Sequence, residues 1–276
     1  MNSVASLDFV RVNSHEGVSQ MPTYTVEAAG LGPVRVDATE YGAGRTFLLL
    51  HGGAGPQSVT GFAELLAATG SRVIVPVHPG FGGTPRPEYL HSMRGLALVY
   101  AGLLDELGLA DVTVIGNSIG GWIAAELAIQ ASPRVSGAVL VDAGGLEVED
   151  HPGADFFSLT PDQVTDLAYY EPEKFRVDFT ALPDQAKAVM AGNQAALRAY
   201  TAGGMTDPSL SGRLAAVPVP VLVVWGAADR IYPPEQGEAF AKAIPGARLT
   251  VLDHAGHLPQ LEAPSALLAA VLDFAR

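Results

Sequence analysis

The sequence predicts an α/β fold whose core is a mostly parallel, doubly wound sheet of eight strands. Short runs of apolar β-formers alternate along the chain with longer segments whose apolar residues recur at helical spacing. Several runs are apolar throughout, as expected of strands that helices cover on both faces. With 276 residues, of which 48% are hydrophobic, the chain is long enough for one large domain that carries an insertion.

The first strands are predicted to form an antiparallel hairpin. Residues 23–28 and 34–40 favour β-structure, and the glycine- and proline-rich turn Gly30-Leu31-Gly32-Pro33 joins them. Residues 1–22 are interpreted as a loose arm. The beginning of the chain has no apolar segment of the kind found in secretory signals, and no apolar run is long enough to cross a bilayer, so a cytoplasmic protein is expected.

Further strands and helices then alternate, which favours right-handed crossovers and a parallel sheet. Leu96, Val99 and Leu103 recur at helical spacing and predict a helix over 92–107. The other strands are predicted at 46–50, 72–77, 112–115, 138–141, 219–225 and 248–252, and the other helices at 61–69, 119–130, 235–243 and 264–274.

The interval 146–212 interrupts this alternation. It is rich in Asp, Glu, Pro and Tyr, favours several short helices and lacks an obvious buried strand. Ligands of open α/β sheets bind beyond the carboxyl ends of the strands, so the interval is interpreted as a lid inserted after the sixth strand. Residues 1–145 and 213–276 then form the two parts of the core domain.

Composition narrows the classes of partner. The formal net charge of −13 disfavours nucleic acid and anionic membranes and favours a small neutral or cationic substrate. The absence of cysteine excludes disulfides and thiol catalysis. No His/Asp/Glu group has metal-ligand spacing, and the glycine loop 52–55 lacks the ending of a phosphate-binding loop, so no metal or cofactor is expected. A monomer or homodimer is expected.

Ser118 is the candidate nucleophile. It stands in Gly116-Asn117-Ser118-Ile119-Gly120, between a run of β-formers and a helix-compatible stretch. A serine on such a sharp strand-to-helix turn needs small flanking residues, because strand and helix crowd together there. The helix N-terminus offers backbone N–H groups to a developing oxyanion.

A general base and an acid are predicted at two later strand ends. His257 follows the last predicted strand, and Asp229 lies in the loop after the preceding strand. The imidazole would activate the serine hydroxyl, and the carboxylate would fix the tautomer of the imidazole. His254 competes with His257 for the role of base, and Asp142, which follows the strand at 138–141, competes with Asp229 for the role of acid.

Together these segments resemble the α/β-hydrolase family in its lidded members, over nearly all of the chain after the arm. The matching pieces are His51-Gly52-Gly53, Gly80-Phe81-Gly82-Gly83-Thr84, the Ser118 turn, Gly226-Ala227-Ala228-Asp229-Arg230-Ile231-Tyr232-Pro233 and Gly256-His257-Leu258-Pro259 with Glu262.

The resemblance implies a catalytic triad of Ser118, Asp229 and His257. It also implies an oxyanion hole made by the N–H groups of Gly53 and Ile119. His51 is expected to anchor its loop. The family often has an aspartate where this chain has His78, and that position supports the loop; His78, His91 and His151 are expected to be ordinary surface or loop histidines.

The first functional hypothesis is a serine hydrolase that cleaves a carboxylic ester. The second is a hydrolase of carbon–carbon bonds in ring-cleavage products, which the Gly53 loop and Asn117 resemble, with Asn117 as a substrate-site residue. Such enzymes usually have a tryptophan where this chain has Leu258, and they use a lid arginine, for which Arg176 and Arg198 are candidates. The third hypothesis is a non-catalytic small-molecule receptor on the same scaffold. Aromatic residues of the lid are candidates for the pocket lining, with plain lid packing as the alternative: Phe156, Phe157, Tyr169, Tyr170 and Tyr200.

Overall fold

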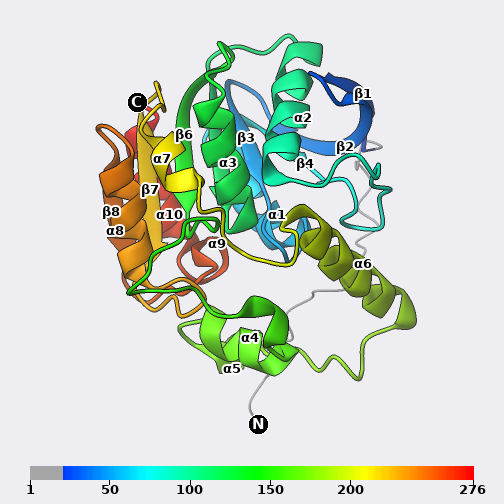
Figure 1. Ribbon diagram of the computed structural model, residues 1–276, viewed down its shortest axis with the longest axis vertical. Coiled ribbons are helices and arrows are strands. Elements are labelled where there is room, and N and C mark those ends of the chain that lie inside the picture. Colours follow the sequence, from blue (N-terminus) through cyan, green and yellow to red (C-terminus); the bar gives the residue numbers. More distant parts are fainter. Residues whose placement is uncertain (1–20) are drawn as a thin grey trace.

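The computed structural model describes residues 21–276 (Figure 1). The predictions for the loose arm and for the absence of a secretory signal fall on residues 1–20 and lie outside the described residues, apart from Met21 and Pro22, which precede the first strand. The strands are β1 (Thr23–Ala28), β2 (Gly32–Gly42), β3 (Arg45–Leu50), β4 (Ser71–Pro76), β5 (Val112–Asn117), β6 (Val135–Val141), β7 (Val221–Gly226) and β8 (Arg248–Leu252).

The strands form the predicted eight-stranded, mostly parallel sheet, in the order β1-β2-β4-β3-β5-β6-β7-β8. β1 and β2 form the predicted hairpin, and β2 also pairs antiparallel with β4. From β4 to β8 every neighbouring pair is parallel, so these strands all end at the same edge of the sheet.

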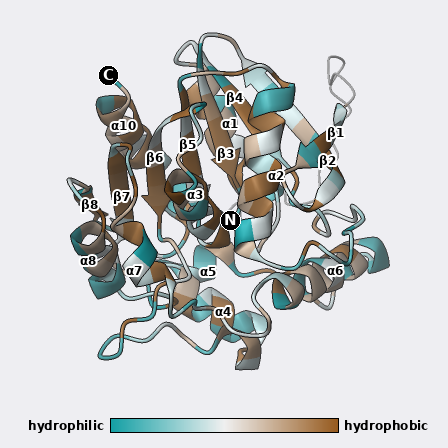
Figure 2. Cartoon of the chain, turned by 45° about the horizontal axis from the view of Figure 1, so that its top comes forward, coloured by the Kyte–Doolittle hydropathy of each residue, from teal (hydrophilic) through white to brown (hydrophobic). Residues whose placement is uncertain are grey.

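Helices cover both faces of the sheet. The helices outside the insertion are α1 (Gln57–Ala67), α2 (Met93–Glu106), α3 (Ile119–Ile129), α8 (Pro234–Ala243), α9 (Pro259–Glu262) and α10 (Pro264–Phe274). One apolar core lies between the sheet and α2, α3 and α8, and a second lies between the sheet and α1 and α10. The central strands are accordingly apolar along their length (Figure 2). In the part of the chain that the structure describes, no helix is long and apolar enough to span a bilayer.

Several predicted bounds differ from the structure for local reasons. α1 begins at Gln57 instead of residue 61, because Pro56 has φ −61° and is already in helical geometry before the apolar spacing starts. β6 begins at Val135 instead of residue 138, and its pairing with β5 shifts register near Val112. This irregular start obscures the strand pattern in the sequence.

The segment between β6 and β7 is helical, and no named strand occurs between residues 146 and 212. One prediction for this segment was wrong: its helices are not all short. α6 has 17 residues and carries only four buried side chains, so its apolar pattern is weak. The helical elements here are η1 (Phe156–Ser158), α4 (Pro161–Ala168), α5 (Pro172–Phe175), α6 (Asp184–Tyr200) and α7 (Leu210–Leu214).

Contacts attach this segment to the loops at the carboxyl ends of the strands. In α6, Asn193 accepts a hydrogen bond from the Gly82 amide at 2.9 Å, and the Tyr200 hydroxyl donates to the Pro79 carbonyl at 2.8 Å. In α4, the Ala168 carbonyl accepts from the amide of His257 at 2.7 Å. The helices thus lie beyond the strand ends, as Figure 1 shows for α4, α5 and α6.

Candidate active site

Ser118 occupies a strained turn between β5 and α3. Its backbone angles are φ 57° and ψ −119°, a conformation that few non-glycine residues adopt. The two flanking glycines have no room for a side chain. A Cβ on Gly116 would lie 2.0 Å from the Gly120 carbonyl oxygen, and one on Gly120 would lie 2.3 Å from the Leu50 oxygen. The sequence requirement for glycine at this turn therefore has a direct steric cause.

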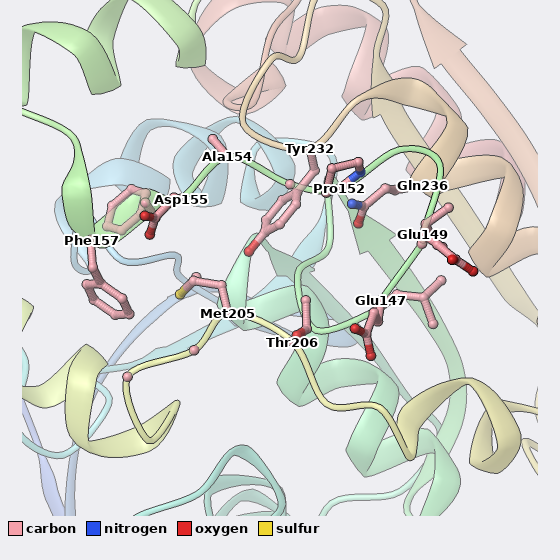
Figure 3. Close-up of a pocket in the computed structure, with 16 residues that line it drawn as sticks. Glu147, Glu149, Pro152, Ala154, Asp155, Phe157, Met205, Thr206, Tyr232 and Gln236 are labelled. Atoms are coloured by element: carbon pink, nitrogen blue, oxygen red, sulfur yellow. The ribbon is translucent and has the colours of Figure 1, made fainter.

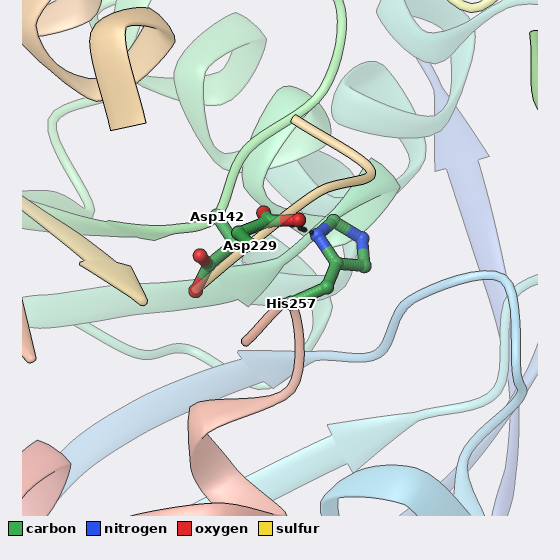
Figure 4. Close-up of side chains that lie close together, drawn as sticks. All are labelled: Asp142, Asp229 and His257. Carbon is green, nitrogen blue, oxygen red and sulfur yellow. Dashed lines mark hydrogen bonds and ion pairs between the residues drawn. The ribbon is translucent and has the colours of Figure 1, made fainter. Parts of the chain in front are cut away.

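His257 and Asp229 form a buried hydrogen-bonded pair (Figure 4). Nδ1 of His257 lies 2.8 Å from Oδ2 of Asp229. The other carboxylate oxygen accepts hydrogen bonds from the amides of Ile231 at 2.8 Å and Tyr232 at 3.0 Å. Because these amides hold the carboxylate in place, the pair fixes which imidazole nitrogen faces the acid and leaves Nε2 free for a proton transfer.

Asn117 links the turn at Ser118 to the loop of His257. Its amide donates to the His257 carbonyl at 2.9 Å and to the Val141 carbonyl at 3.3 Å, and its Oδ1 accepts from Gln260 at 3.1 Å. The side chain is buried. Its polar atoms thus hold the end of β5 against the His257 loop, beside the serine.

The amides of Gly53 and Ile119 are available as donors. Among residues 21–276, neither amide has a hydrogen-bond acceptor. Ile119 is the first residue of α3, where the helix dipole adds positive potential. The Gly53 loop lies close to the nucleophile position, since a Cβ on Gly52 would lie 3.2 Å from the Ser118 Cβ. An oxyanion near Ser118 would therefore meet unpaired N–H groups.

His51 and His78 are both completely buried. His78 was expected to be a surface or loop histidine, and it lies in the loop after β4 but not at the surface. The His78 amide donates to Nε2 of His51 at 3.1 Å, and Nε2 of His78 lies 2.9 Å from the His51 carbonyl oxygen. Nδ1 of His78 contacts the Tyr100 hydroxyl. Burial lowers the pKa of His51 to about 4, and burial also holds the pKa of His78 well below its usual value. Two neutral imidazoles thus join the loops after β3 and β4.

The competing residues lie in different surroundings. His254 is exposed and packs its ring against Tyr170, with 5.1 Å between the ring centroids. Asp142 is buried, and its Oδ1 accepts from the Gly226 amide at 2.8 Å. Burial and the neighbouring Asp229 raise the pKa of Asp142 well above its usual value. The structure places Asp229, rather than Asp142, on Nδ1 of His257.

The two candidate arginines of the segment 146–212 have partners of their own. Arg176 pairs with the acidic residues Asp162, Asp166 and Glu173, at 3.5, 2.6 and 2.7 Å. The Arg198 guanidinium lies 4.2 Å from the centre of the Phe157 ring. Leu258 is buried in the apolar core beside His257.

The aromatic residues of the segment 146–212 divide between packing and the cavity. Tyr169 stacks on Phe175 at 4.4 Å, and Tyr200 is buried against the Pro79 loop. Phe156 and Phe157 line a cavity of about 700 Å³.

The cavity lies between the start of the segment 146–212 and the loop after β7 (Figure 3). Its charged lining residues are all acids, Glu147, Glu149 and Asp155. Tyr232 also lines it, and the ring of Tyr232 lies 5.5 Å from the ring of His257. The lining contains neither Ser118 nor His257, so Tyr232 stands between the cavity and the His257–Asp229 pair.

The sequence has relatives among curated hydrolases. It is 29% identical to a 2-hydroxy-6-oxo-6-phenylhexa-2,4-dienoate hydrolase of Burkholderia cepacia, over 91% of this chain and 94% of the relative. It is 30% identical to a 2-hydroxy-6-oxononadienedioate/2-hydroxy-6-oxononatrienedioate hydrolase of Cupriavidus pinatubonensis, over 87% of this chain and 90% of the relative.

The fold is similar to that of a thermophilic esterase from Thermogutta terrifontis. The TM-score is 0.74 and the identity 25%, over 92% of this chain and 97% of the esterase. The model of the alpha/beta hydrolase family matches residues 47–271, which contain the strained serine turn and the His257–Asp229 pair. The chain is therefore an enzyme of the hydrolase class and belongs to the alpha/beta hydrolase family.

Proposed function

We propose that the protein is a serine hydrolase that cleaves a carboxylic ester of a small uncharged or cationic substrate. The observation that carries the proposal is the strained Ser118 turn beside unpaired amides, with a buried imidazole–carboxylate pair contributed by the loops after β7 and β8. These are the nucleophile, oxyanion donors, base and orienting acid that acyl transfer requires.

In the proposed mechanism, Oγ of Ser118 attacks the ester carbonyl carbon while Nε2 of His257 takes the hydroxyl proton. The N–H groups of Gly53 and Ile119 stabilise the oxyanion of the tetrahedral intermediate. His257 returns the proton to the leaving alcohol, and Asp229 stabilises the imidazolium in between. Water activated by His257 then attacks the acyl-enzyme and releases the acid and Ser118.

The preference for an uncharged or cationic substrate rests on the cavity beside Tyr232. The charged residues that line this cavity are acidic, and Arg176 is paired with three carboxylates. Three lining carboxylates would repel an anionic group inside this cavity, whereas, among the described residues, the one cation beside a lining residue is Arg198, which lies over Phe157. We include in the proposal that residues 146–212 act as the lid and hold the specificity-determining side chains, because this segment lines the cavity and packs on the loop of His257.

A second candidate is a hydrolase of carbon–carbon bonds in ring-cleavage products. It is favoured by the names of both curated relatives, at 29 and 30% identity. The same triad would serve. The distinguishing requirement is recognition of an acidic diketone, which the acidic cavity lining disfavours.

Two measurements test the proposal. Purified Ser118→Ala, with folding checked by circular dichroism, is expected to lose ester hydrolysis by at least about a thousandfold, since triad and oxyanion hole act as a unit. Ser265→Ala, an exposed serine on α10, is the matched control and is expected to keep full activity. A folded Ser118→Ala variant that hydrolyses p-nitrophenyl acetate at the rate of the unmodified protein would show that the nucleophile is wrongly assigned.

A panel of neutral esters, cationic esters, lactones and a vinylogous 1,5-diketone acid then identifies the bond. Higher kcat/KM on the neutral or cationic esters supports the proposal, and higher kcat/KM on the diketone acid establishes the second candidate. A fluorophosphonate probe should label Ser118. Absence of both labelling and turnover would favour the non-catalytic receptor.

A further inference from the structure

Asp142 is a second buried acid beside the His257–Asp229 pair, and the mechanism above does not use it. It follows β6 with φ 44°, its amide donates to the Val224 carbonyl at 2.9 Å, and its side chain is completely buried. One polar atom from each of Asp142, Asp229 and His257 lies within 4.8 Å of the other two (Figure 4).

The two oxygens of Asp142 differ. Oδ1 accepts a hydrogen bond from the Gly226 amide at 2.8 Å. Oδ2 is buried and has no hydrogen-bond partner in the part of the chain that the structure describes. A buried carboxylate with an unpaired oxygen is costly, whereas a protonated carboxyl can use that oxygen as a donor.

The charges around Asp142 also favour the neutral form. Burial raises the pKa of Asp142, and the nearby carboxylates of Asp229, in the loop after β7, and Glu262, in α9, raise it as well. The other titratable groups that face the cluster are His257 and Tyr232, and neither is hydrogen-bonded to Asp142. Among the described residues, no lysine or arginine forms an ion pair with Asp142.

Asp229 is already held as the charged partner. Three hydrogen-bonding groups converge on its carboxylate: the amides of Ile231 and Tyr232 and the imidazole of His257. Two neighbouring buried acids cannot both ionise at low cost, so the acid with three stabilising partners keeps the charge and the acid with one amide keeps the proton.

We propose that Asp142 is a protonated positioning residue, which donates a hydrogen bond through Oδ2–H to Asp229. The two acids would then share a single negative charge, which faces His257. The donated hydrogen bond adds a further contact to the Asp229 carboxylate. This contact keeps the carboxylate in the orientation that bonds to Nδ1 of His257. Only the catalytic role of Asp142 rests on the proposed function, because its protonation state can be measured without a substrate.

The direct test is the carboxyl ¹³C resonance of Asp142, assigned by its loss in Asp142→Asn. We expect the resonance at the chemical shift of a protonated carboxyl at pH 7. A chemical shift typical of a carboxylate at pH 7 would overturn the proposal. This measurement needs no substrate, so its result is independent of whether Ser118→Ala abolishes activity.

The second test compares the imidazole pKa of His257 between the unmodified protein and Asp142→Asn by NMR titration. Asn is neutral, keeps an acceptor for Gly226 and a donor for Asp229, and tolerates the positive φ. If Asp142 is already neutral, the pKa of His257 and the acid limb of kcat/KM should stay within about 0.3 units. Loss of a negative charge at this distance would instead lower the pKa of His257 by about 1 unit or more, which contradicts the proposal.

A donor-less variant separates positioning from packing. Asp142→Gly suits the positive φ and removes the proposed donor. We expect kcat to fall about tenfold with KM unchanged, while Asp142→Asn retains kcat within about threefold. Equal losses of kcat in both folded variants would show that a neutral hydrogen-bond donor at this position does not support activity, and would refute the proposal.

Discussion

The backbone of Ser118, the candidate nucleophile, is held in a strained conformation by its neighbours. Its φ of 57° places the side chain at a turn that only the flanking glycines allow, because Cβ atoms at Gly116 or Gly120 would collide with backbone oxygens. The strain is maintained by the packed strand and helix on either side. A short motif in the sequence therefore corresponds to a definite steric requirement.

The orienting acid gives a prediction at this scale. Asp229→Asn would present an amide to Nδ1 of His257 and favour the wrong tautomer, so kcat is expected to fall by about 10³- to 10⁴-fold. The variant should fold, because an amide oxygen can still accept from Ile231 and Tyr232. Steady-state kinetics on an ester measures the effect.

The matched control is Asp105→Asn, an exposed acid paired with Arg134, which is expected to keep kcat within about twofold. A loss of less than about tenfold in Asp229→Asn would argue that another group, with Asp142 the nearest candidate, orients His257.

At the scale of elements, one ion pair joins α7 to α3. Glu126 in α3 is 1% exposed, and both its oxygens contact Arg213 of α7, at 2.5 and 2.8 Å. Arg213 also contacts Asp207 at 2.6 Å. A buried carboxylate that depends on one guanidinium is vulnerable to loss of that partner.

Arg213→Met is therefore expected to lower the free energy of unfolding by about 3 kcal/mol, because Glu126 would lose its countercharge. Urea denaturation measures the change. Arg248→Met removes an exposed pair with Asp273 and should cost at most about 1 kcal/mol. If both variants lose a similar amount of unfolding free energy, then the burial of Glu126 does not make its pair with Arg213 more important than an exposed pair.

For the whole molecule, the buried histidines couple stability to pH. The pKa of His51 is lowered to about 4 in the folded protein, whereas an unfolded chain would have about 6.5. Between these values the unfolded state binds the additional proton, so stability is lost as the pH falls from 6.5 toward 4. The full contribution of His51 is about 3 kcal/mol.

The measurement is the pH dependence of the urea unfolding free energy in the unmodified protein and in His51→Gln. His78 contributes in the same direction, and a raised pKa at Asp142 acts in the opposite direction. Because His51 helps to lower the pKa of His78, the difference between the two proteins measures His51 together with its effect on His78. Between pH 6.5 and 4, the unfolding free energy of the unmodified protein should fall more steeply than that of His51→Gln, by about 1.4 kcal/mol per pH unit. His91→Asn, an exposed histidine, should leave the slope unchanged. Parallel curves for His51→Gln and the unmodified protein would contradict the prediction.

Much of the architecture was predictable because its signals are local. Continuous apolar runs predicted the buried parallel strands, a glycine- and proline-rich turn predicted the hairpin, and Gly116 to Gly120 predicted the serine turn. Each of these requires only side-chain size, polarity or backbone freedom within a few residues. The relative order of Ser118, Asp229 and His257 along the chain likewise follows from reading the strand ends.

The remaining features depend on contacts between distant segments. The burial of His78 depends on contacts with His51 and Tyr100, and the convergence of Asp142 and Asp229 depends on β6 lying beside β7. The length of α6 was not apparent because few of its side chains are buried. By itself the sequence determined the sheet and the turn at Ser118, since these follow from local stereochemistry, and the candidate triad came from the predicted strand ends together with the family resemblance. Only the tertiary structure decided which acid faces His257 and which partners Arg176 and Arg198 have, because burial and pairing arise when the chain is packed.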